Sequence, residues 1–314
     1  EQATGERWKV LQVVEEEKVP ETDACEKTME SMINLDSASL LFPTSYGYFS
    51  PHTLKLAKKY PKARFEHAGG LWTDKDPKNV GSYFGYIDEA QYVAGIVAGH
   101  STKSGKLGFV AAKPIPQLLR NVNAFLLGAR LAKPDATLQV IFTGDWSMPV
   151  KEAEATNSLI DAGVDVVTCH VDGPKTVMEN AARRGAMISG YHVNAAPLAP
   201  EAYLTGAEWN WEAIYPKFVK MFTSGETIPN FYRGGLKEEI VKLSPYGPKV
   251  SEQARKHADE VKAKLMTGSY VMYKGPIKDN KGNTVIAAGA EQATTAPELE
   301  SMNYLVEGVI GSTS

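Results

Sequence analysis

The chain has 314 residues, which is long for a single hydrophobic core and suits two lobes. Apolar residues make up 43% of it and charged residues 23%, proportions typical of globular proteins. The net charge is −3, with acids and bases mixed along the chain, which excludes the basic face of a nucleic-acid-binding protein. No run of about 20 apolar residues occurs, so we expect no membrane-spanning helix.

The first part of the chain alternates short apolar runs with helical patterns. The opening residues Glu1–Trp8 are typical of the inside of a helix, so we expect further residues upstream in the natural protein. The predicted strands are Trp8–Val14, Ser39–Phe42, Ala63–His67 and Val80–Phe84. The predicted helices are Thr22–Ile33 (capped by Thr22 or Asp23), Ser50–Tyr60 (with Pro51 in its first turn) and Glu89–His100. The last helix is rich in Ala and Gly, and we expect these small side chains to bring it close to a sheet.

The same rhythm restarts near residue 106. The predicted strands are Lys106–Ala111, Thr137–Phe142, Val164–Cys169 and Ala186–Tyr191. The predicted helices are Pro116–Ala132, Met148–Ala162 (ended by Gly163) and Lys175–Arg184 (ended by Gly185). The less regular tail predicts a helix over Val250–Met266, a strand near Tyr270–Tyr273, a hairpin turn at Lys278–Asn283 and an apolar element at Met302–Ile310.

Alternation at this period predicts an α/β fold of two doubly wound parallel-sheet lobes, with helices on both faces and right-handed crossovers. We place the first crossing between lobes near Ala112–Pro116. Lobe 1 would span 1–112 and be completed by about 212–275. Lobe 2 would span 113–211 and be completed by about 276–314.

The two cysteines, Cys25 and Cys169, fall in different predicted lobes. A disulfide requires Cα atoms within about 7 Å of each other. We favour two buried thiols that act as small apolar side chains.

In open parallel sheets, ligands bind beyond the carboxyl ends of the strands. The loops at these ends are predicted at Pro43–Phe49, His67–Trp72, Ala112–Pro116, Thr143–Pro149, His170–Pro174 and Tyr191–Pro197. They concentrate rings and single polar groups: Tyr46, Tyr48, Phe49, His67, Trp72, Trp146, His170, Asp172, Tyr191, His192 and Asn194. This mixture favours a flat, partly polar ligand, on which rings stack while a few donors and acceptors set its orientation.

Catalytic and metal-binding patterns are mostly excluded. The sequence lacks phosphate-loop, dinucleotide, zinc-protease and nucleophile-elbow motifs. His170 and Asp172 would share one strand face by strict alternation, but no nucleophile accompanies them. Cys169, His170 and Asp172 are close in sequence, but no second cluster completes a metal site. We therefore predict a binding protein that is not an enzyme and has no cofactor or metal.

Trp146 has two interpretations. It is either a core residue under a helix start or a half-exposed platform for a flat ligand. Asp145, Ser147 and Pro149 surround it with turn-forming residues, and a residue before proline is restricted toward extended conformations.

Several long segments resemble the basic membrane protein family, the solute-binding proteins of ABC importers whose best-known members are purine nucleoside receptors. They are TSYGYFSPHTLKLAKKYPKARFEHAGG, YFGYIDEAQYVAGIVAG, GKLGFVAAKPIPQLLRNVNAFLLGARLAKPDATLQVIF, WSMPVKE, CHVDGP, EWNW, GPIKDNKG and MNYLVEGVIG. The resemblance covers nearly the whole chain from Trp8. It implies the type I periplasmic binding protein fold, a ligand enclosed between the lobes, and a periplasmic or other extracytoplasmic location, commonly as a lipoprotein. It also implies a preceding strand and loop, with an Asp and aromatic ligand contacts, upstream of these residues.

The resemblance assigns ligand roles to residues of this chain. Trp146 matches the aromatic ring that stacks on the base, and Asp172 matches an acidic position of related members. The nucleoside receptors' G-V-D-x-D pattern is replaced by Gly190–Asn194, which lacks both acids, and their lysine is replaced near Trp209. The candidate ligand-binding residues are Trp146, Asp172, Tyr48, Tyr46, His170, Asn194, His192, Trp209, Glu89 and Trp72.

Loss of the acids and the lysine removes the polar contacts to a sugar. We therefore expect a purine-type nucleobase or a similar flat heterocycle in the inter-lobe cleft of an importer receptor. The expected partners are a membrane permease and its ATPase, with the receptor as a monomer and no nucleic acid bound. The alternatives are a nucleoside-binding receptor, a ligand sensor for a signalling system and, less favoured, a nucleoside hydrolase.

Overall fold

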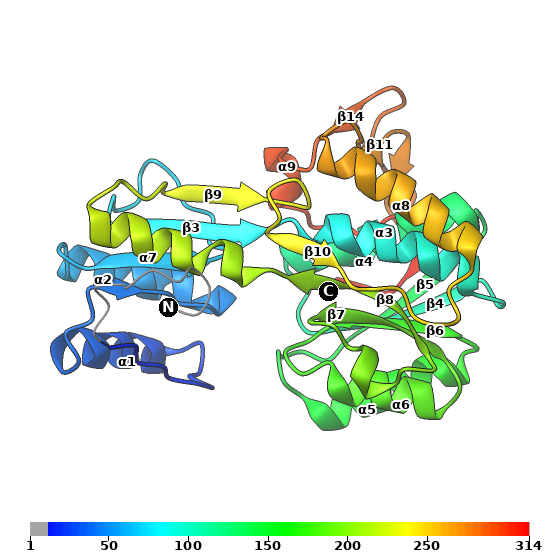
Figure 1. Ribbon diagram of the computed structural model, residues 1–314, viewed down its shortest axis with the longest axis horizontal. Coiled ribbons are helices and arrows are strands. Elements are labelled where there is room, and N and C mark those ends of the chain that lie inside the picture. Colours follow the sequence, from blue (N-terminus) through cyan, green and yellow to red (C-terminus); the bar gives the residue numbers. More distant parts are fainter. Residues whose placement is uncertain (1–11, 314) are drawn as a thin grey trace. The chain divides into compact units, whose positions relative to one another are not determined.

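Parallel strands and helices alternate along the chain in the computed structural model, which describes residues 12–313 (Figure 1). The described chain forms two compact units. Unit 1 comprises the described residues up to Gly85 together with Asn210–Gly234, and unit 2 comprises Tyr86–Trp209 together with the described residues from Gly235 onward. The chain therefore passes between the units three times, at 85–86, 209–210 and 234–235. In this described part, no helix is long and apolar enough to cross a bilayer.

Unit 1 contains one parallel sheet with helices on both faces. Its strands, in sheet order, are β1 (Leu40–Leu41), β2 (Arg64–Ala68), β3 (Val80–Gly85) and β9 (Phe231–Gly234). Its helices are α1 (Asp23–Asn34), α2 (Leu54–Lys59) and α7 (Tyr215–Ser224), with short turns η1 (Tyr46–Tyr48), η2 (Phe49–Thr53) and η4 (Trp211–Ala213).

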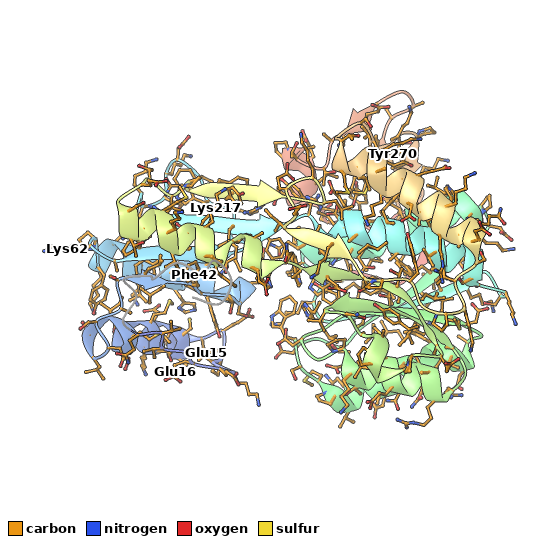
Figure 2. All side chains as sticks on the ribbon, viewed as in Figure 1. Glu15, Glu16, Phe42, Lys62, Lys217 and Tyr270 are labelled. Atoms are coloured by element: carbon orange, nitrogen blue, oxygen red, sulfur yellow. The ribbon has the colours of Figure 1, made fainter. Side chains whose placement is uncertain are left out.

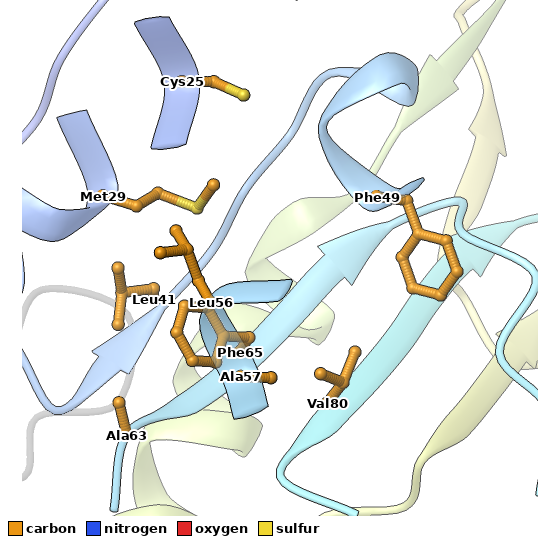
Figure 3. Close-up of a cluster of buried hydrophobic side chains, with 9 residues drawn as sticks. All are labelled: Cys25, Met29, Leu41, Phe49, Leu56, Ala57, Ala63, Phe65 and Val80. Atoms are coloured by element: carbon orange, nitrogen blue, oxygen red, sulfur yellow. The ribbon is translucent and has the colours of Figure 1, made fainter. Parts of the chain in front are cut away.

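The two faces of this sheet have different cores, because successive side chains of a strand point to opposite sides. On one face, Met29 of α1 and Leu56 of α2 pack with Phe65 and Val80 of the strands (Figure 3). On the other face, Tyr83 is fully buried, and its hydroxyl donates to the Tyr215 hydroxyl at 2.9 Å. The ring of Phe42, labelled in Figure 2, lies 5.1 Å from that of Tyr215.

Two predictions for unit 1 need correction. Residues 8–11 of the predicted strand Trp8–Val14 lie outside the described residues, and residues 12–14 form no strand, with Val13 84% exposed. The predicted helix Ser50–Tyr60 begins only at Leu54. Ser50 is extended (φ −124°, ψ 128°), because the proline that follows it disfavours the helical conformation of the residue before it.

Unit 2 contains a seven-stranded sheet covered by α3 and α4 on one face and by α5 and α6 on the other (Figure 1). In sheet order, the strands are β10 (Val241–Leu243), β8 (Tyr203–Trp209), β7 (Met187–His192), β6 (Val166–His170), β4 (Lys106–Ala111), β5 (Thr137–Phe142) and β15 (Val309–Ile310). Only the β10–β8 pair among these strands is antiparallel.

The remaining elements of unit 2 complete its layers and its tail. The helices are α3 (Ile87–Ser101), α4 (Pro116–Ala132), α5 (Pro149–Asp161), α6 (Lys175–Arg183), α8 (Glu252–Met266) and α9 (Pro297–Glu300), with the short turn η3 (Ala196–Leu198). The small antiparallel pairs are β11 (Tyr273–Lys274) with β14 (Glu291–Gln292) and β12 (Ile277–Lys278) with β13 (Thr284–Ile286). The latter pair confirms the predicted hairpin. The predicted strand near Tyr270–Tyr273 is reduced to the two-residue strand β11. The predicted apolar element Met302–Ile310 contains the buried residues Met302, Leu305 and Val306 and ends in the two-residue strand β15.

The compact units differ from the predicted lobe bounds. We predict a first crossing near Ala112–Pro116, but residues 86–112 belong to unit 2, because β4 pairs in parallel with both β5 and β6. Of the segment 212–275 assigned to lobe 1, only the part up to Gly234 lies in unit 1. The two successive series of alternating strands and helices look alike in the sequence. Hydrophobic periodicity therefore predicts the strands but not the sheet that each strand joins.

The Ala- and Gly-rich helix α3 packs against the sheet, as predicted, and its glycines also bring it close to another helix, α4. A Cβ on Gly95 would lie 2.2 Å from the carbonyl oxygen of Phe125 in α4, and a Cβ on Gly128 of α4 would lie 2.0 Å from that of Tyr92. The absence of these side chains lets the two backbones touch.

Both cysteines are free and buried, Cys25 in unit 1 and Cys169 in unit 2, as favoured from the sequence. Burial raises the pKa of the Cys25 thiol to about 11 and raises that of the Cys169 thiol further. Both thiols are therefore neutral and act as apolar side chains.

Candidate functional site

Five rings follow one another across neighbouring strand ends of unit 2. We call them the ring series, and they are Trp146, His170, Tyr191, His192 and Trp209. The centroid distances are 6.0 Å from Trp146 to His170, 4.5 Å from His170 to Tyr191 and 4.0 Å from Tyr191 to His192. The indole Nε1 of Trp209 donates to Nδ1 of His192 at 3.0 Å, which joins the last two rings.

The sheet topology brings these residues together. β5, β6, β7 and β8 run in the same direction, so their carboxyl ends lie at one edge. His170, His192 and Trp209 are the last residues of β6, β7 and β8, and Trp146 lies in the loop after β5. This is the edge at which open parallel sheets bind ligands.

His192 is locked by hydrogen bonds at both ring nitrogens. Its Nδ1 accepts from Trp209, so the neutral ring carries its hydrogen on Nε2, which donates to the carbonyl oxygen of Val171 at 2.9 Å. Burial lowers the pKa of His192 to about 4, which keeps the ring neutral near pH 7. Its backbone is left-handed (φ 72°), an uncommon conformation for a residue with a side chain. His192 therefore fixes the indole of Trp209.

Trp146 lies in a loop supported by charged neighbours. Its backbone N–H donates to Oδ1 of Asp145 at 2.9 Å, and the same carboxylate binds Nζ of Lys113 at 3.0 Å. The hydrogen bond from Lys113 is the main reason that the pKa of Asp145 is lowered. The Lys113 ammonium lies 5.5 Å from the centre of the Trp146 ring, within cation–π range. The indole is only partly buried, which suits a stacking platform.

Asp172 and Asn194 are both exposed in loops of this edge. β6 ends at His170, so the strict alternation expected for His170 and Asp172 does not reach Asp172. The backbone N–H of Asp172 donates to the carbonyl oxygen of Trp146 at 2.8 Å, which places this acid beside the loop of Trp146. Oδ1 of Asn194 accepts from the N–H of Ala196 at 3.0 Å and thereby caps the turn η3.

The candidates from unit 1 have local structural partners. The Tyr48 hydroxyl donates to the carbonyl oxygen of Val19, and burial raises the pKa of the partly buried Tyr46. Nε1 of Trp72 donates to the carbonyl oxygen of Pro77 at 3.3 Å, with the Lys78 ammonium 4.7 Å from the ring centre. These contacts hold the loops at the carboxyl ends of β1 and β2.

Glu89 lies at the start of α3 and is 8% exposed. Its Oε2 accepts from the N–H of Leu236 at 2.8 Å. Burial raises the pKa of Glu89 to about 7. This carboxyl connects two stretches of chain that directly follow crossings from unit 1.

Asn121 is a site residue that the sequence does not single out. This buried side chain of α4 lies behind the ring series, with Nδ2 2.8 Å from Nδ1 of His170. Its position inside a helical pattern offers no signal, because nothing local distinguishes it from Asn123 two residues later.

One group of acids and a histidine in the described chain lies close enough to hold a metal ion: Asp23, Glu26 and His52. It lies on unit 1, where His52 follows the predicted site residue Tyr48 by four residues. Glu26 already binds Nδ1 of His52 at 2.8 Å and Nζ of Lys55 at 2.6 Å. These contacts account for the cluster as an ion-pair network.

Similar proteins agree with this architecture. Residues 7–275 match the model of the Bmp family, ABC transporter substrate-binding proteins that are PnrA-like. A purine-binding protein of Brucella abortus is 34% identical over 86% of this chain and 75% of its own. A putative ABC transporter glucose-binding protein of Haloferax volcanii is 30% identical over 99% of this chain and 74% of its own.

The fold also matches solved structures. An ABC transporter solute-binding protein from Aeropyrum pernix K1 superposes with a TM-score of 0.69 at 19% identity, over 83% of this chain and 82% of its own. This likeness confirms the predicted type I periplasmic binding fold. The family implies a small-molecule ligand, a membrane transporter as partner and a place outside the cytoplasm. On the extent of the family match, this chain belongs to the Bmp family of ABC transporter substrate-binding proteins.

Proposed function

We propose that this substrate-binding protein takes up a purine-type nucleobase, or a similar flat heterocycle, at the ring series of unit 2. The ring series carries the proposal. Trp146 is partly exposed beside His170, and a flat ligand can stack on its ring while polar groups at the same edge contact the rim of the ligand. In this proposal the protein is a monomer that delivers its ligand to the membrane permease and ATPase of an ABC importer.

The polar groups at this edge favour a base over a nucleoside. The two positions where nucleoside receptors carry acids hold His192, with both ring nitrogens engaged, and Asn194, whose Oδ1 caps a turn. Neither side chain offers a carboxylate to ribose hydroxyls. Asp172 is exposed beside the loop of Trp146 and offers a carboxylate acceptor for N–H groups of a base.

The names of two relatives suggest two different ligands to compare. The Brucella protein is named for purines and the Haloferax protein for glucose. We therefore expect calorimetric titration of the purified, ligand-stripped protein to show binding of adenine, hypoxanthine or xanthine, with adenosine, guanosine and glucose weaker. Tighter binding of either nucleoside would overturn the choice of a bare base, and tighter binding of glucose would overturn the flat heterocycle.

Replacement of Trp146 tests the stacking platform itself. We expect Trp146→Ala to weaken binding of the preferred base by about 1–3 kcal/mol, the range for base–aromatic stacking. Trp146→Phe keeps a ring and should retain most of the affinity. An unchanged affinity in the alanine variant, with normal thermal unfolding, would make Trp146 a purely structural residue.

A further inference from the structure

The His170 ring is largely buried, with the rings of Tyr191 and Trp146 beside it. Its plane is inclined by 32° to that of Tyr191 at a centroid distance of 4.5 Å, and by 38° to that of Trp146 at 6.0 Å. The residue is 7% exposed. Only a small part of His170 is therefore open to a ligand beside the ring series.

Asn121 determines which nitrogen of His170 carries the hydrogen. The amide Nδ2 of Asn121 lies 2.8 Å from Nδ1 of His170, and Asn121 is 1% exposed. An amide nitrogen only donates, so Nδ1 of His170 accepts and the neutral ring carries its hydrogen on Nε2. Burial lowers the pKa of His170 well below its usual value, with a smaller effect from His192, so the ring remains neutral at physiological pH.

The opposite nitrogen of His170 is available. Among the described residues, Nε2 has no hydrogen-bond partner, and it is not one of the fully enclosed polar atoms that lack one. Nε2 is therefore not fully enclosed, and its hydrogen is left for a partner outside the described chain.

We propose that Asn121 is a positioning residue that holds His170 in its Nε2–H tautomer, so that His170 donates a hydrogen bond to an acceptor atom on the edge of the ligand. This role deepens the proposed function and rests on it for the identity of the ligand. It makes the site selective for heterocycles that present a ring nitrogen or carbonyl oxygen at that edge. Asn121 acts only through His170 and does not touch the ligand.

The tautomer can be measured without any ligand. In the full chain labelled with ¹⁵N-histidine, long-range proton–nitrogen spectra distinguish a ring nitrogen that carries a hydrogen from one that does not. The His170 signals are identified by their loss in His170→Gln. We expect Nδ1 without hydrogen and Nε2 with it, and no protonation between pH 8 and pH 6. A hydrogen on Nδ1 in the unaltered protein would overturn the proposal.

Substitutions then test the cause. Asn121→Asp presents an acceptor to Nδ1, so the hydrogen should move there and leave Nε2 as an acceptor. Asn121→Leu removes the donor and should give a mixture of tautomers, which keeps the test informative if the buried carboxylate prevents folding. The matched control is Asn123→Leu, because Asn123 is equally buried on α4 but bonds to Tyr304 and Val306. It should leave the His170 signals unchanged. An unchanged tautomer in Asn121→Leu would refute the role of Asn121.

A ligand series tests the hydrogen bond from His170. Adenine is compared with its 1-, 3-, 7- and 9-deaza analogues, each of which replaces one ring nitrogen by carbon. In the unaltered protein, we expect one replacement of an acceptor nitrogen to lower affinity about tenfold. In Asn121→Asp, that discrimination should vanish or reverse, since two acceptors would then face each other. Equal discrimination in both proteins would exclude the donor role of His170. If no purine binds at all while the tautomer is as expected, the proposed ligand fails but the role of Asn121 stands.

Discussion

His67, His170 and His192 share the same neutral tautomer but differ in the groups that they bind. His67 bonds the loops after β1 and β2, because its Nδ1 accepts from Gly70 at 3.0 Å and its Nε2 donates to Ser45 at 2.8 Å. His192 fixes Trp209, and His170 keeps one nitrogen for a partner outside the described chain. A neutral imidazole serves here as a donor and acceptor of fixed direction rather than as a base.

The pH dependence of stability should reveal His67. Burial lowers its pKa from 6.5 to about 4, so between these values the unfolded chain binds more protons than the folded one. The contribution of His67 is therefore complete above pH 6.5 and is lost as the pH falls toward 4. We expect the unaltered protein to lose on the order of 3 kcal/mol relative to His67→Gln over this interval, measured by urea unfolding. Parallel pH profiles for the two proteins would contradict this assignment.

At the scale of elements, backbone contact between α3 and α4 organises unit 2. Gly95 and Gly99 of α3 face carbonyl oxygens of α4, and Gly128 of α4 faces Tyr92 of α3. The first turn of α3 carries Glu89, and α4 carries Asn121, whose amide contacts His170. The close approach of the two helices therefore supports the position of the site.

Gly128→Ala tests that approach. In an exposed helix interior, alanine is more favourable for stability than glycine by about 1 kcal/mol. Overpacking a tight contact, however, costs about 1–3 kcal/mol of stability, occasionally more. The new Cβ would lie 2.0 Å from a backbone oxygen, which cannot turn away as a side chain can, so we expect the steric effect to win and unfolding free energy to fall by about 2 kcal/mol. The control is Gly173→Ala, where no atom lies within 4 Å of the added carbon and stability should hardly change. A stabilised Gly128→Ala would refute close helix packing.

At the scale of the whole molecule, the chain crosses between two units three times, and residues next to the crossings are unusually polar for their burial. Glu89, three residues after the first crossing is complete, bonds to Leu236, just after the third. The adjacent Asp88 binds Arg120 at 2.9 Å in a pair that is almost fully buried. Such groups are stable only in one arrangement of partners, because each would be costly to leave unpaired.

Glu89→Gln should therefore change stability in a pH-dependent way. Burial raises the pKa of Glu89 from 4.5 to about 7, so the folded state binds more protons between these values, and stability falls as the pH rises through this interval. The glutamine variant removes that dependence while its side-chain oxygen can still accept from Leu236. We expect the variant to gain on the order of 2–3 kcal/mol relative to the unaltered protein between pH 4.5 and pH 8, measured by urea unfolding. A constant difference across this range would show that Glu89 is not protonated as described.

The candidate site was only partly predictable. Trp146, His170, His192 and Trp209 were identified because they follow predicted strands or match family positions, and the strand ends gather them at one edge of unit 2. Asn121 gave no signal, because its role depends on His170 across 49 residues of chain. The hydrophobic pattern does not predict β8 for a related reason. Its buried Thr205 and Glu208 are satisfied by Ser244 beside β10, and hydropathy does not record partners so far away.

The sequence by itself determined the α/β alternation, the bounds of β4, α4 and β5 to the residue, the free cysteines and the family. The alternation and the element bounds depend on periodicity and capping, which are local properties of the chain, and the family depends on the resemblance of long segments. Only the tertiary structure decided which sheet receives β4, that the glycines of α3 meet a helix, and which nitrogen of each buried histidine carries hydrogen. Those outcomes depend on contacts between residues far apart in the sequence, and such contacts produce no recognisable pattern in the local sequence.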